Sequence, residues 1–422
     1  MSALDPTLLI DRLDEVTLFG MLWFVLLLDL PRYTLGFLAL VLGACLRRRP
    51  ELFPLAPTPL VSVVIAGHNE ASAIRRCVLS LREQTHRRLQ IICVDDGSTD
   101  GMRLELQRLR REALIDAALS TSRRCGKSSA LNLGISRAHG ELVVITDCDC
   151  TFDRDAIEQL ILPFADPRVG ATCANIGARN LRHGVIEALQ GLEYMLSMSL
   201  GRRLLDLFGQ VSCAAGALCC VRRTALMAIG GFDVGPGEDL DLTLRLRNAG
   251  WAVRFAERAW CLTDVPSTFA GLVCQRLRWE RDALRLRLRK HRYSIDPRDF
   301  RGGWPELGHQ IEFLFSHVAL TLIFPLYLLW LIVTFGASTP TVLVLVILCY
   351  AALDTLAALC ALILIDRPGC RVLLPYIVLI GPFNAFVMRA IRLVAYTQEW
   401  IFDRSYRDGF VPPHVAEKAP RY

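Results

Sequence analysis

Residues 60–70 read LVSVVIAGHNE, an apolar and largely β-branched run that ends abruptly in polar residues. A continuous apolar run of this kind is typical of a strand buried on both faces. Residues 71–83 follow with apolar side chains at helical spacing. Further strands are predicted at 89–94 and 141–146, and a helix at 128–138. Strands that alternate with helices predict an α/β domain whose mixed, mostly parallel sheet is covered by helices.

Long apolar runs flank this domain. With 53% hydrophobic residues, the 422-residue chain is too apolar for an ordinary soluble protein. Runs at 311–336 and 341–365 exceed the 20 or so apolar residues that a membrane-spanning helix needs, and 372–395 is either a weaker span or a half-inserted helix. The run at 16–46 is interrupted by Asp29 and Pro31, so it forms either one kinked span or a short re-entrant pair.

These runs predict three parts of the chain. Residues 1–50 form an N-terminal membrane segment, 51–300 a cytoplasmic domain with interfacial helices at its C-terminal end, and 301–422 a membrane bundle with a short tail. Arg47–Arg49 and the basic stretch Arg285–Arg292 place the middle part in the cytoplasm by the positive-inside tendency. We expect Arg285–Arg292 to bind lipid at the surface of the inner or plasma membrane.

The net charge and the cysteine content agree with a cytoplasmic domain beside a membrane. The net charge of +6 fits an anionic lipid surface, and no motif supports nucleic-acid binding. The 15 cysteines are scattered, which predicts reduced packing residues rather than a disulfide framework or a zinc site.

Acidic residues follow the predicted strand ends. Residues 145–150 read ITDCDC, and in an extended segment Asp147 and Asp149 point the same way. Two such carboxylates can hold one Mg²⁺ or Mn²⁺ whose shell is completed by substrate phosphates. The alternative is that both aspartates, like Asp95-Asp96, are only turn or cap residues.

A second acidic pair, Glu238-Asp239, precedes the ambiguous segment LDLTLRLRNAG. Its leucines alternate as in a strand, yet leading acids, trailing arginines and a closing Gly250 favour a helix that begins at the acidic pair. A plain charge preference at a helix start would also explain Glu238.

The segment 266–291 predicts a basic amphipathic helix that contains QRLRW at 275–279. Its Trp279 offers an apolar face for a sugar ring, or alternatively an interfacial membrane anchor. Within the predicted spans, Asp354 and Asn384 are candidates for a polar path, although a helix–helix hydrogen bond is the favoured interpretation of Asp354.

Six motifs occur in order between residues 61 and 279: VSVVIAGHNE, VDDGSTDG, GKSSALNLG, ITDCDC, GGFDVGPGEDLDL and QRLRW. In this order, in a membrane-flanked chain, they resemble the processive family 2 glycosyltransferases, the group of cellulose, chitin, hyaluronan and poly-N-acetylglucosamine synthases. The resemblance implies a GT-A fold and a nucleotide-diphosphate sugar donor, most often UDP-linked. One departure is Gly237, where processive members commonly have Thr.

The resemblance also implies roles for individual residues. The nucleotide-sugar would contact Asn69, Glu70, Asp95, Asp96, Lys127 and Asp147, and the metal would be held by Asp149 with Asp147. Asp239, with Glu238, would be the general base. The acceptor and pyrophosphate region would comprise Gln275, Arg276, Arg278 and Trp279, with Cys213 in the looser match CAAGA at 213–217.

The expected function is a membrane-embedded, inverting polymerisation of a β-linked polysaccharide from UDP-GlcNAc or UDP-Glc, with translocation of the product. Its partners would be the UDP-sugar, the growing glycan, the lipid bilayer and export subunits. A transferase that adds one sugar to a lipid or oligosaccharide is the runner-up. An inactive export scaffold is the third interpretation, against which the intact acidic residues speak.

Overall fold

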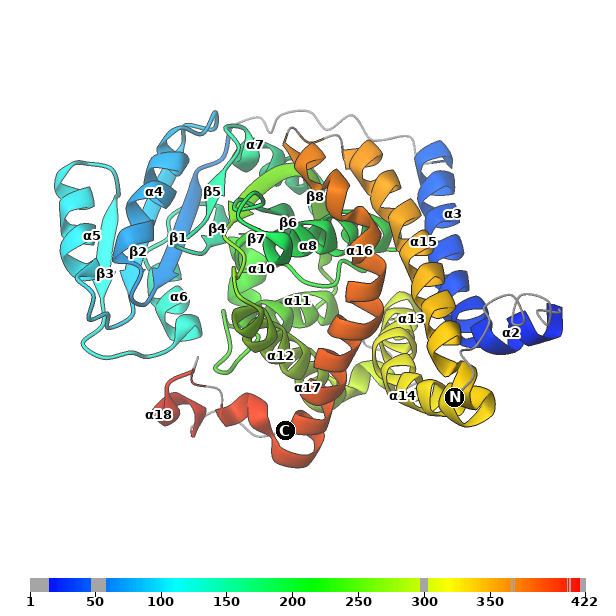
Figure 1. Cartoon of the computed structure of the whole chain (residues 1–422). Coiled ribbons are helices and arrows are strands. Elements are labelled where there is room, and N and C mark those ends of the chain that lie inside the picture. The colour runs from blue at the N-terminus through cyan, green and yellow to red at the C-terminus, as the bar shows by residue number, and fades with distance from the viewer. Residues whose placement is uncertain are drawn as a thin grey trace. The chain divides into compact units, whose positions relative to one another are not determined.

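The computed structural model describes residues 15–46, 58–296, 303–365, 367, 369–407, 409 and 411–417 (Figure 1). The chain divides into two compact units. The first comprises Met1–Arg48 and Ile311–Val394, and the second comprises Arg49–Gln310 and Ala395–Tyr422. The C-terminal segment from residue 395 therefore belongs with the α/β unit. The domain boundaries predicted at residues 50 and 300 stay a prediction.

The second unit is built on one eight-stranded sheet (Figure 1). Its strands are β1 (Val61–Gly67), β2 (Leu89–Asp95), β3 (Ala117–Ser120), β4 (Leu142–Thr146), β5 (Thr151–Phe152), β6 (Val169–Ala178), β7 (Leu218–Arg222) and β8 (Ala252–Thr263). They lie in the order β3-β2-β1-β4-β7-β6-β8-β5. β7 pairs antiparallel with β4 and β6, and β5 with β8, while the other neighbours are parallel. The mixed, mostly parallel sheet expected from the sequence is confirmed.

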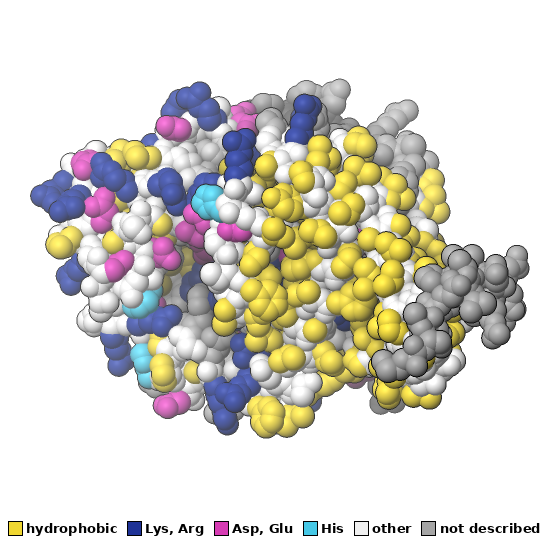
Figure 2. Space-filling view, viewed as in Figure 1, with side chains coloured by type: hydrophobic (Ala, Val, Ile, Leu, Met, Phe, Trp, Pro, Cys, Tyr) yellow, Lys and Arg dark blue, Asp and Glu magenta, His cyan; other side chains and the backbone are white. Residues whose placement is uncertain are grey.

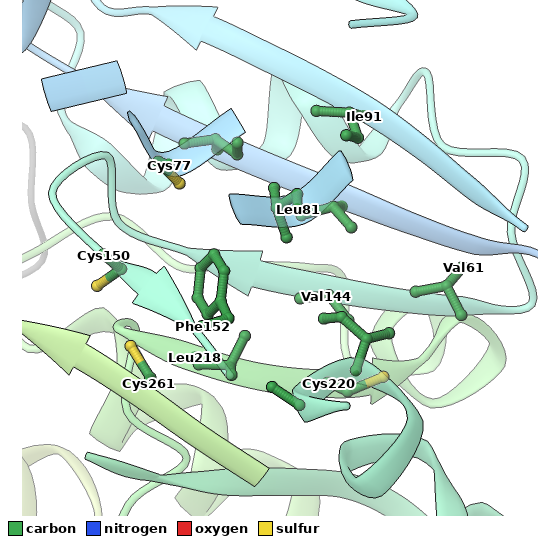
Figure 3. Packing of buried hydrophobic residues seen from close by; sticks show 14 of the residues in the cluster. Val61, Cys77, Leu81, Ile91, Val144, Cys150, Phe152, Leu218, Cys220 and Cys261 are labelled. Carbon is green, nitrogen blue, oxygen red and sulfur yellow. The ribbon is translucent and has the colours of Figure 1, made fainter. Parts of the chain in front are cut away.

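Both faces of the sheet are buried. Val63 and Ile65 pack into one hydrophobic cluster, and Val64 and Ala66 into another. Successive residues of a strand point to opposite faces, so β1 needs an uninterrupted apolar sequence. Figure 3 shows the first cluster, in which Cys77 and Leu81 of α4 lie against strand residues. The cysteines in this cluster are free and act as small packing residues.

The helices around the sheet begin with α4 (Ala71–Arg82), α5 (Met102–Arg111), α6 (Lys127–Ile135), α7 (Ala156–Ile161), α8 (Val185–Tyr194), α9 (Arg202–Leu207) and α10 (Arg223–Ala228). After them come α11 (Glu238–Asn248), α12 (Phe269–Arg285) with its π-helical extension η4 (Leu286–Lys290), and α18 (Pro413–Ala416). The segment after Gly237 is a helix, as predicted. At Gly134 of α6 an added Cβ would lie 2.4 Å from Val64 Cγ1, so this helix packs directly against β1.

The first unit is helical and apolar. It contains α2 (Glu15–Phe24), η1 (Val25–Asp29), α3 (Leu30–Leu46), α14 (Leu320–Phe335), α15 (Thr339–Ile365) and α16 (Ile377–Pro382), and it shares α13 (Gly303–Phe313) and α17 (Arg389–Phe402) with the other unit. Hydrophobic side chains cover the visible face of α15 and α16 almost continuously (Figure 2). Within the part of the chain that the structure describes, three helical runs are long and apolar enough to cross a membrane: Leu18–Leu40, Gly303–Ile365 and Cys370–Phe402. The protein is a membrane protein.

The helical runs refine the predicted spans. Leu18–Leu40 is helical through Asp29 and Pro31, which agrees with a kinked single span rather than a re-entrant pair. The runs predicted at 311–336 and 341–365 lie in one candidate, in which a short 3-10 helix at Gly336–Ser338 joins α14 to α15.

Polar residues inside the first unit pair with one another. Asn384 donates a hydrogen bond to Asp354 at 3.2 Å, which confirms the favoured helix–helix interpretation. Arg389 lies 3.0 Å from Asp29, which also accepts a 2.5 Å hydrogen bond from Tyr350. Such pairing is what makes charged groups tolerable in an apolar bundle.

Candidate active site

Three polar segments meet where β1, β2 and β4 end. Asp95 at the end of β2 accepts a hydrogen bond from the backbone of Ser98 at 2.9 Å. Asp96 accepts hydrogen bonds from the backbone of Cys125 and Gly126, at 2.6 and 2.8 Å. Both aspartates are buried, at 2% and 3% exposure. Each of these carboxylates therefore fixes a loop of the site, and their predicted contact with a nucleoside stays a prediction.

The predicted nucleotide contacts on the β1 side lie in a constrained turn. Asn69 has a left-handed backbone (φ 59°) and its side chain accepts a hydrogen bond from the backbone of Thr99 at 2.8 Å. Ser98 Oγ accepts a hydrogen bond from the Asn69 backbone at 2.9 Å. The β1 and β2 turns are thus tied together, which holds Glu70 at the start of α4.

Lys127 joins the two acidic pairs of the sequence. Its Nζ lies 2.7 Å from Asp147 Oδ1 and 3.0 Å from Glu238 Oε1. Burial lowers the pKa of Lys127, but Asp147, Glu238 and Asp239 outweigh it, so the net pKa is well above its usual value and the side chain is charged. The structure therefore brings the Asp147-Cys148-Asp149 segment, a DxD motif, and the start of α11 together around one cation.

Asp149 is held from two sides. Its Oδ2 accepts a hydrogen bond from Thr263 Oγ1 at 2.9 Å, and its backbone carbonyl accepts one from Arg179 at 3.0 Å. Arg179 is itself ion-paired with Asp264 at 2.6 Å. Sequence reasoning missed Thr263, Arg179 and Asp264, because they lie at the ends of β6 and β8 and are brought to Asp149 only by the sheet order.

The carboxylates near Asp149 repel one another. The pKa of Glu70 is raised, first by burial and then by the nearby Asp149, Asp147 and Asp100. A concentration of carboxylate oxygens that raises a neighbour's pKa fits a hard divalent cation. Among the described residues, no group of three or more His, Cys, Asp or Glu side chains forms a ready-made metal cage. The predicted metal site at Asp147 and Asp149 therefore stays a prediction.

Asp239 lies in the first turn of α11, against the loop 213–217. Its Oδ2 accepts a hydrogen bond from the Gly216 backbone at 3.3 Å. Thr243 docks the same loop, because its hydroxyl accepts from the Ala214 backbone at 2.8 Å and donates to the Asp239 carbonyl at 2.7 Å. The pKa of Cys213 is raised, first by burial and then by Asp239, so its thiol stays protonated beside the carboxylate. The CAAGA match is therefore adjacent to the predicted base.

The QRLRW residues lie on α12. Trp279 packs with Ala215 and Ala217 of the loop 213–217 against a small hydrophobic cluster. Arg276 is buried at 2% exposure, and its guanidinium lies 4.3 Å from the centroid of the Trp279 ring. Gln275 accepts a 3.4 Å hydrogen bond from Arg276. The loop that begins at Cys213 and the Trp279 ring thus pack against the same cluster, through Ala215 and Ala217 of the loop.

The lipid-binding prediction for Arg285–Arg292 is wrong for the basic residues from Arg285 to His291. Arg285 and Arg287 are 3% and 4% exposed, and His291 is 2% exposed. Their partners are protein groups: Arg285 donates to the Pro236 carbonyl at 2.5 Å, and Arg287 donates to Gln310 at 3.1 Å. Arg289 pairs with Asp403, Lys290 pairs with Asp233 and Asp241, and His291 contacts Asp241. A basic sequence pattern does not reveal which acids fold against it.

A cluster of ion pairs around Asp241 holds α11 in place. Asp241 lies 2.8 Å from Lys290 Nζ and 2.8 Å from His291 Nε2, and it pairs with Arg245 at 2.9 Å. Burial alone raises the pKa of Asp241, but these three neighbours outweigh it and hold the pKa well below its usual value. The carboxylate two residues after Asp239 is therefore a structural anchor.

Comparison with known proteins agrees with this geometry. The family model described as "Glycosyl transferase family 2" matches residues 62–230. The chain is 28% identical over 222 residues to a poly-beta-1,6-N-acetyl-D-glucosamine synthase of Staphylococcus aureus, covering 52% of this chain and 53% of that protein. It is 30% identical over 243 residues to an N-acetylglucosaminyltransferase of Mesorhizobium japonicum, covering 54% and 57%. The chain thus matches a little over half the length of these curated relatives.

A solved structure shares the fold. The mannosyltransferase of Pyrobaculum calidifontis, in complex with GDP-Man and Mn²⁺, superimposes with a TM-score of 0.64. The match covers 91% of this chain and 99% of that chain at 22% identity. The expected GT-A architecture with flanking apolar helices is confirmed.

Proposed function

Because the chain carries a family 2 glycosyltransferase domain, we propose that it is an inverting membrane glycosyltransferase that polymerises a β-linked polysaccharide from a UDP-sugar. We favour UDP-GlcNAc over UDP-Glc, because both curated relatives are named for N-acetylglucosamine. The observation that carries the proposal is Lys127, which contacts Asp147 of the DxD segment and Glu238 beside the predicted base. Donor-binding and acceptor-activating groups are then parts of one site.

In this mechanism Asp239 accepts the proton of the acceptor hydroxyl. A sugar hydroxyl is a weak nucleophile, and a positioned carboxylate raises the rate by about 10²–10⁴-fold. The hydrogen bond from Gly216 and the docking of loop 213–217 by Thr243 fix the carboxylate beside the predicted acceptor surface. Direct displacement inverts the anomeric centre, so an α-linked donor gives a β-linked product.

Lys127 and Arg278 act on the donor diphosphate. Lys127 is charged and already lies at the DxD carboxylate, so an arriving phosphate offers it a further anionic partner. Asp149 and Asp147 would hold Mg²⁺ or Mn²⁺, and the ion would supply charge neutralisation for the leaving diphosphate. The Mn²⁺ in the Pyrobaculum complex supports a divalent ion at this site.

The membrane unit fits the same proposal. A polar polymer does not cross hydrocarbon unaided, and the three candidate spans would surround its path. With the positive-inside tendency of Arg47–Arg49, the glycosyltransferase domain would face the cytoplasm. Export subunits would receive the chain on the other side.

The test is UDP release by the purified, detergent-solubilised protein with Mg²⁺ or Mn²⁺ across a panel of UDP-sugars, followed by sizing of the product. Long chains from UDP-GlcNAc alone are expected. Products extended by one sugar would instead establish the single-addition transferase. Silence with every donor, in the presence of a copurifying partner, would favour the inactive scaffold.

A further inference from the structure

A buried ion pair lies behind the predicted acceptor surface. Nη2 of Arg276 on α12 donates a hydrogen bond to Glu193 Oε2 on α8, at 2.5 Å. The side chain of Arg276 is 2% exposed and that of Glu193 is 18% exposed. A charge removed from water to this extent is tolerated only with a close counter-charge. Glu193 is therefore the group that allows a charged arginine at this position.

Arg276 also contacts Trp279. The two residues are three positions apart on α12, so they share a helix face. The Arg276 guanidinium lies 4.3 Å from the Trp279 ring centroid and 5.6 Å from that of Tyr194. A cation at this distance from an indole face is attracted to it. The indole is thus held by a cation whose own position is set by Glu193.

The ring held in this way adjoins the predicted reaction centre. Trp279, Ala215 and Ala217 pack against the same hydrophobic cluster, and the two alanines flank the Gly216 amide that donates to Asp239. The indole itself is only partly buried. Donor-side Asp149 is held by Thr263 and Arg179, near Val265 and Ala178 of the same cluster, through hydrogen bonds that do not involve the indole.

We propose that Glu193 and Arg276 are positioning residues that hold the Trp279 indole as a stacking surface for the pyranose ring of the acceptor glycan. This inference rests on the proposed function. It also gives Arg276 a task other than the phosphate contact expected from the sequence, because its guanidinium is already engaged by Glu193 and Trp279. The ligand class is a β-linked oligosaccharide of N-acetylhexosamine.

The decisive variant is Glu193→Gln, which keeps the size of the side chain and removes its charge. We expect the acceptor KM to rise about tenfold, while kcat at saturating acceptor and the donor KM for UDP release without acceptor stay close to wild type. Binding of a short β-linked N-acetylglucosamine oligosaccharide to the UDP-loaded protein, measured by calorimetry, should weaken by the same factor. Arg276→Lys should behave similarly, since an ammonium lacks the planar fork.

Two further variants separate positioning from general damage. In a Trp279→Leu background, adding Glu193→Gln should leave the acceptor affinity unchanged, because the pair acts through the indole. Asp206→Asn is the matched control: it removes one charge from the Arg254–Asp206 pair, at 2.8 Å, elsewhere in the same unit. It should leave the acceptor KM at the wild-type value.

The proposal is overturned if Glu193→Gln leaves oligosaccharide affinity unchanged, or if its effect persists in Trp279→Leu. It is also overturned if the affinities for donor and acceptor decrease together, as they would after a general loss of structure. Should the wild type transfer no sugar at all, the proposed function fails while the calorimetric comparison still tests the positioning role.

Discussion

Replacing Lys127 by Met removes the cation that the structure places between the two acidic pairs. Its Nζ lies 2.7 Å from Asp147 and 3.0 Å from Glu238, and the three side chains are 22%, 35% and 11% exposed. Hydrogen bonds to charged groups contribute about 1.5–3 kcal/mol each. Because Asp147 is more than a third exposed, we discount its share for solvent screening and expect a net loss of about 2–3 kcal/mol.

This loss should appear as a lower melting temperature. For a domain of this size, about 1 kcal/mol corresponds to about 2–4 °C, so the variant should melt about 4–12 °C lower without divalent ions. Mn²⁺ should then stabilise the variant more than the wild type, because the ion no longer competes with an ammonium for Asp147. We expect the affinity of the variant for Mn²⁺ to rise about tenfold. UDP should bind more weakly, because the lysine that would contact its diphosphate is absent.

The assay is differential scanning fluorimetry of the detergent-solubilised protein over a Mn²⁺ titration, with UDP affinity measured in parallel. Lys127→Arg is the matched control, because it retains the charge and should keep most of the stability. An unchanged melting temperature in Lys127→Met, or an Mn²⁺ response no larger than that of the wild type, would refute the reasoning.

Three other perturbations test the site. Asp239→Asn should lower the transfer rate by about 10²–10⁴-fold with UDP affinity kept, and an equal loss of UDP affinity would contradict its role as base. Asp149→Ala should weaken metal-dependent donor binding in calorimetry, and an unchanged metal dependence would refute it. Asp241 has a depressed pKa in the folded state, so its stabilisation is present above its unfolded value of about 3.9 and is lost as pH falls below it. Asp241→Asn should therefore be less stable at pH 7 and flatten the acid limb of a stability–pH profile, whereas a parallel limb would show that other groups cause it.

Local sequence was sufficient for the strands that carry the site. β1, β2 and β4 are covered on both faces, so they read as continuous apolar runs that end at the polar clusters. β8 could not be found in this way, because charged residues interrupt it and one of them, Arg254, is paired with Asp206 of α9 at 2.8 Å. The antiparallel placement of β7 depends on sheet order, which no local pattern encodes.

The same limit applies to the residues around the predicted site. Asp147, Asp149 and Asp239 could be predicted because each carries its chemistry in a short motif. Thr263 and Glu193 could not, since each acquires its role from a partner far along the chain: Thr263 meets Asp149 across 114 residues, and Glu193 meets Arg276 across 83. Residues that hold functional groups in place are ordinary in sequence and are recognised only by their contacts.

Gly237 shows how the basic segment after α12 bears on the predicted base. It has a left-handed backbone (φ 72°), and an added Cβ would lie 2.9 Å from Leu286 Cδ1 and 3.1 Å from Asp282 Cβ. α12 and its π-helical extension therefore approach the start of α11 so closely that a Cβ at this position would displace the Leu286 side chain and crowd Asp282. Arg285 of α12 donates a hydrogen bond to the carbonyl of Pro236, the residue before Gly237, and so also holds α12 close to the start of α11. The glycine that departs from the family pattern is thus matched to the buried basic segment, and both fix the turn from which Asp239 projects.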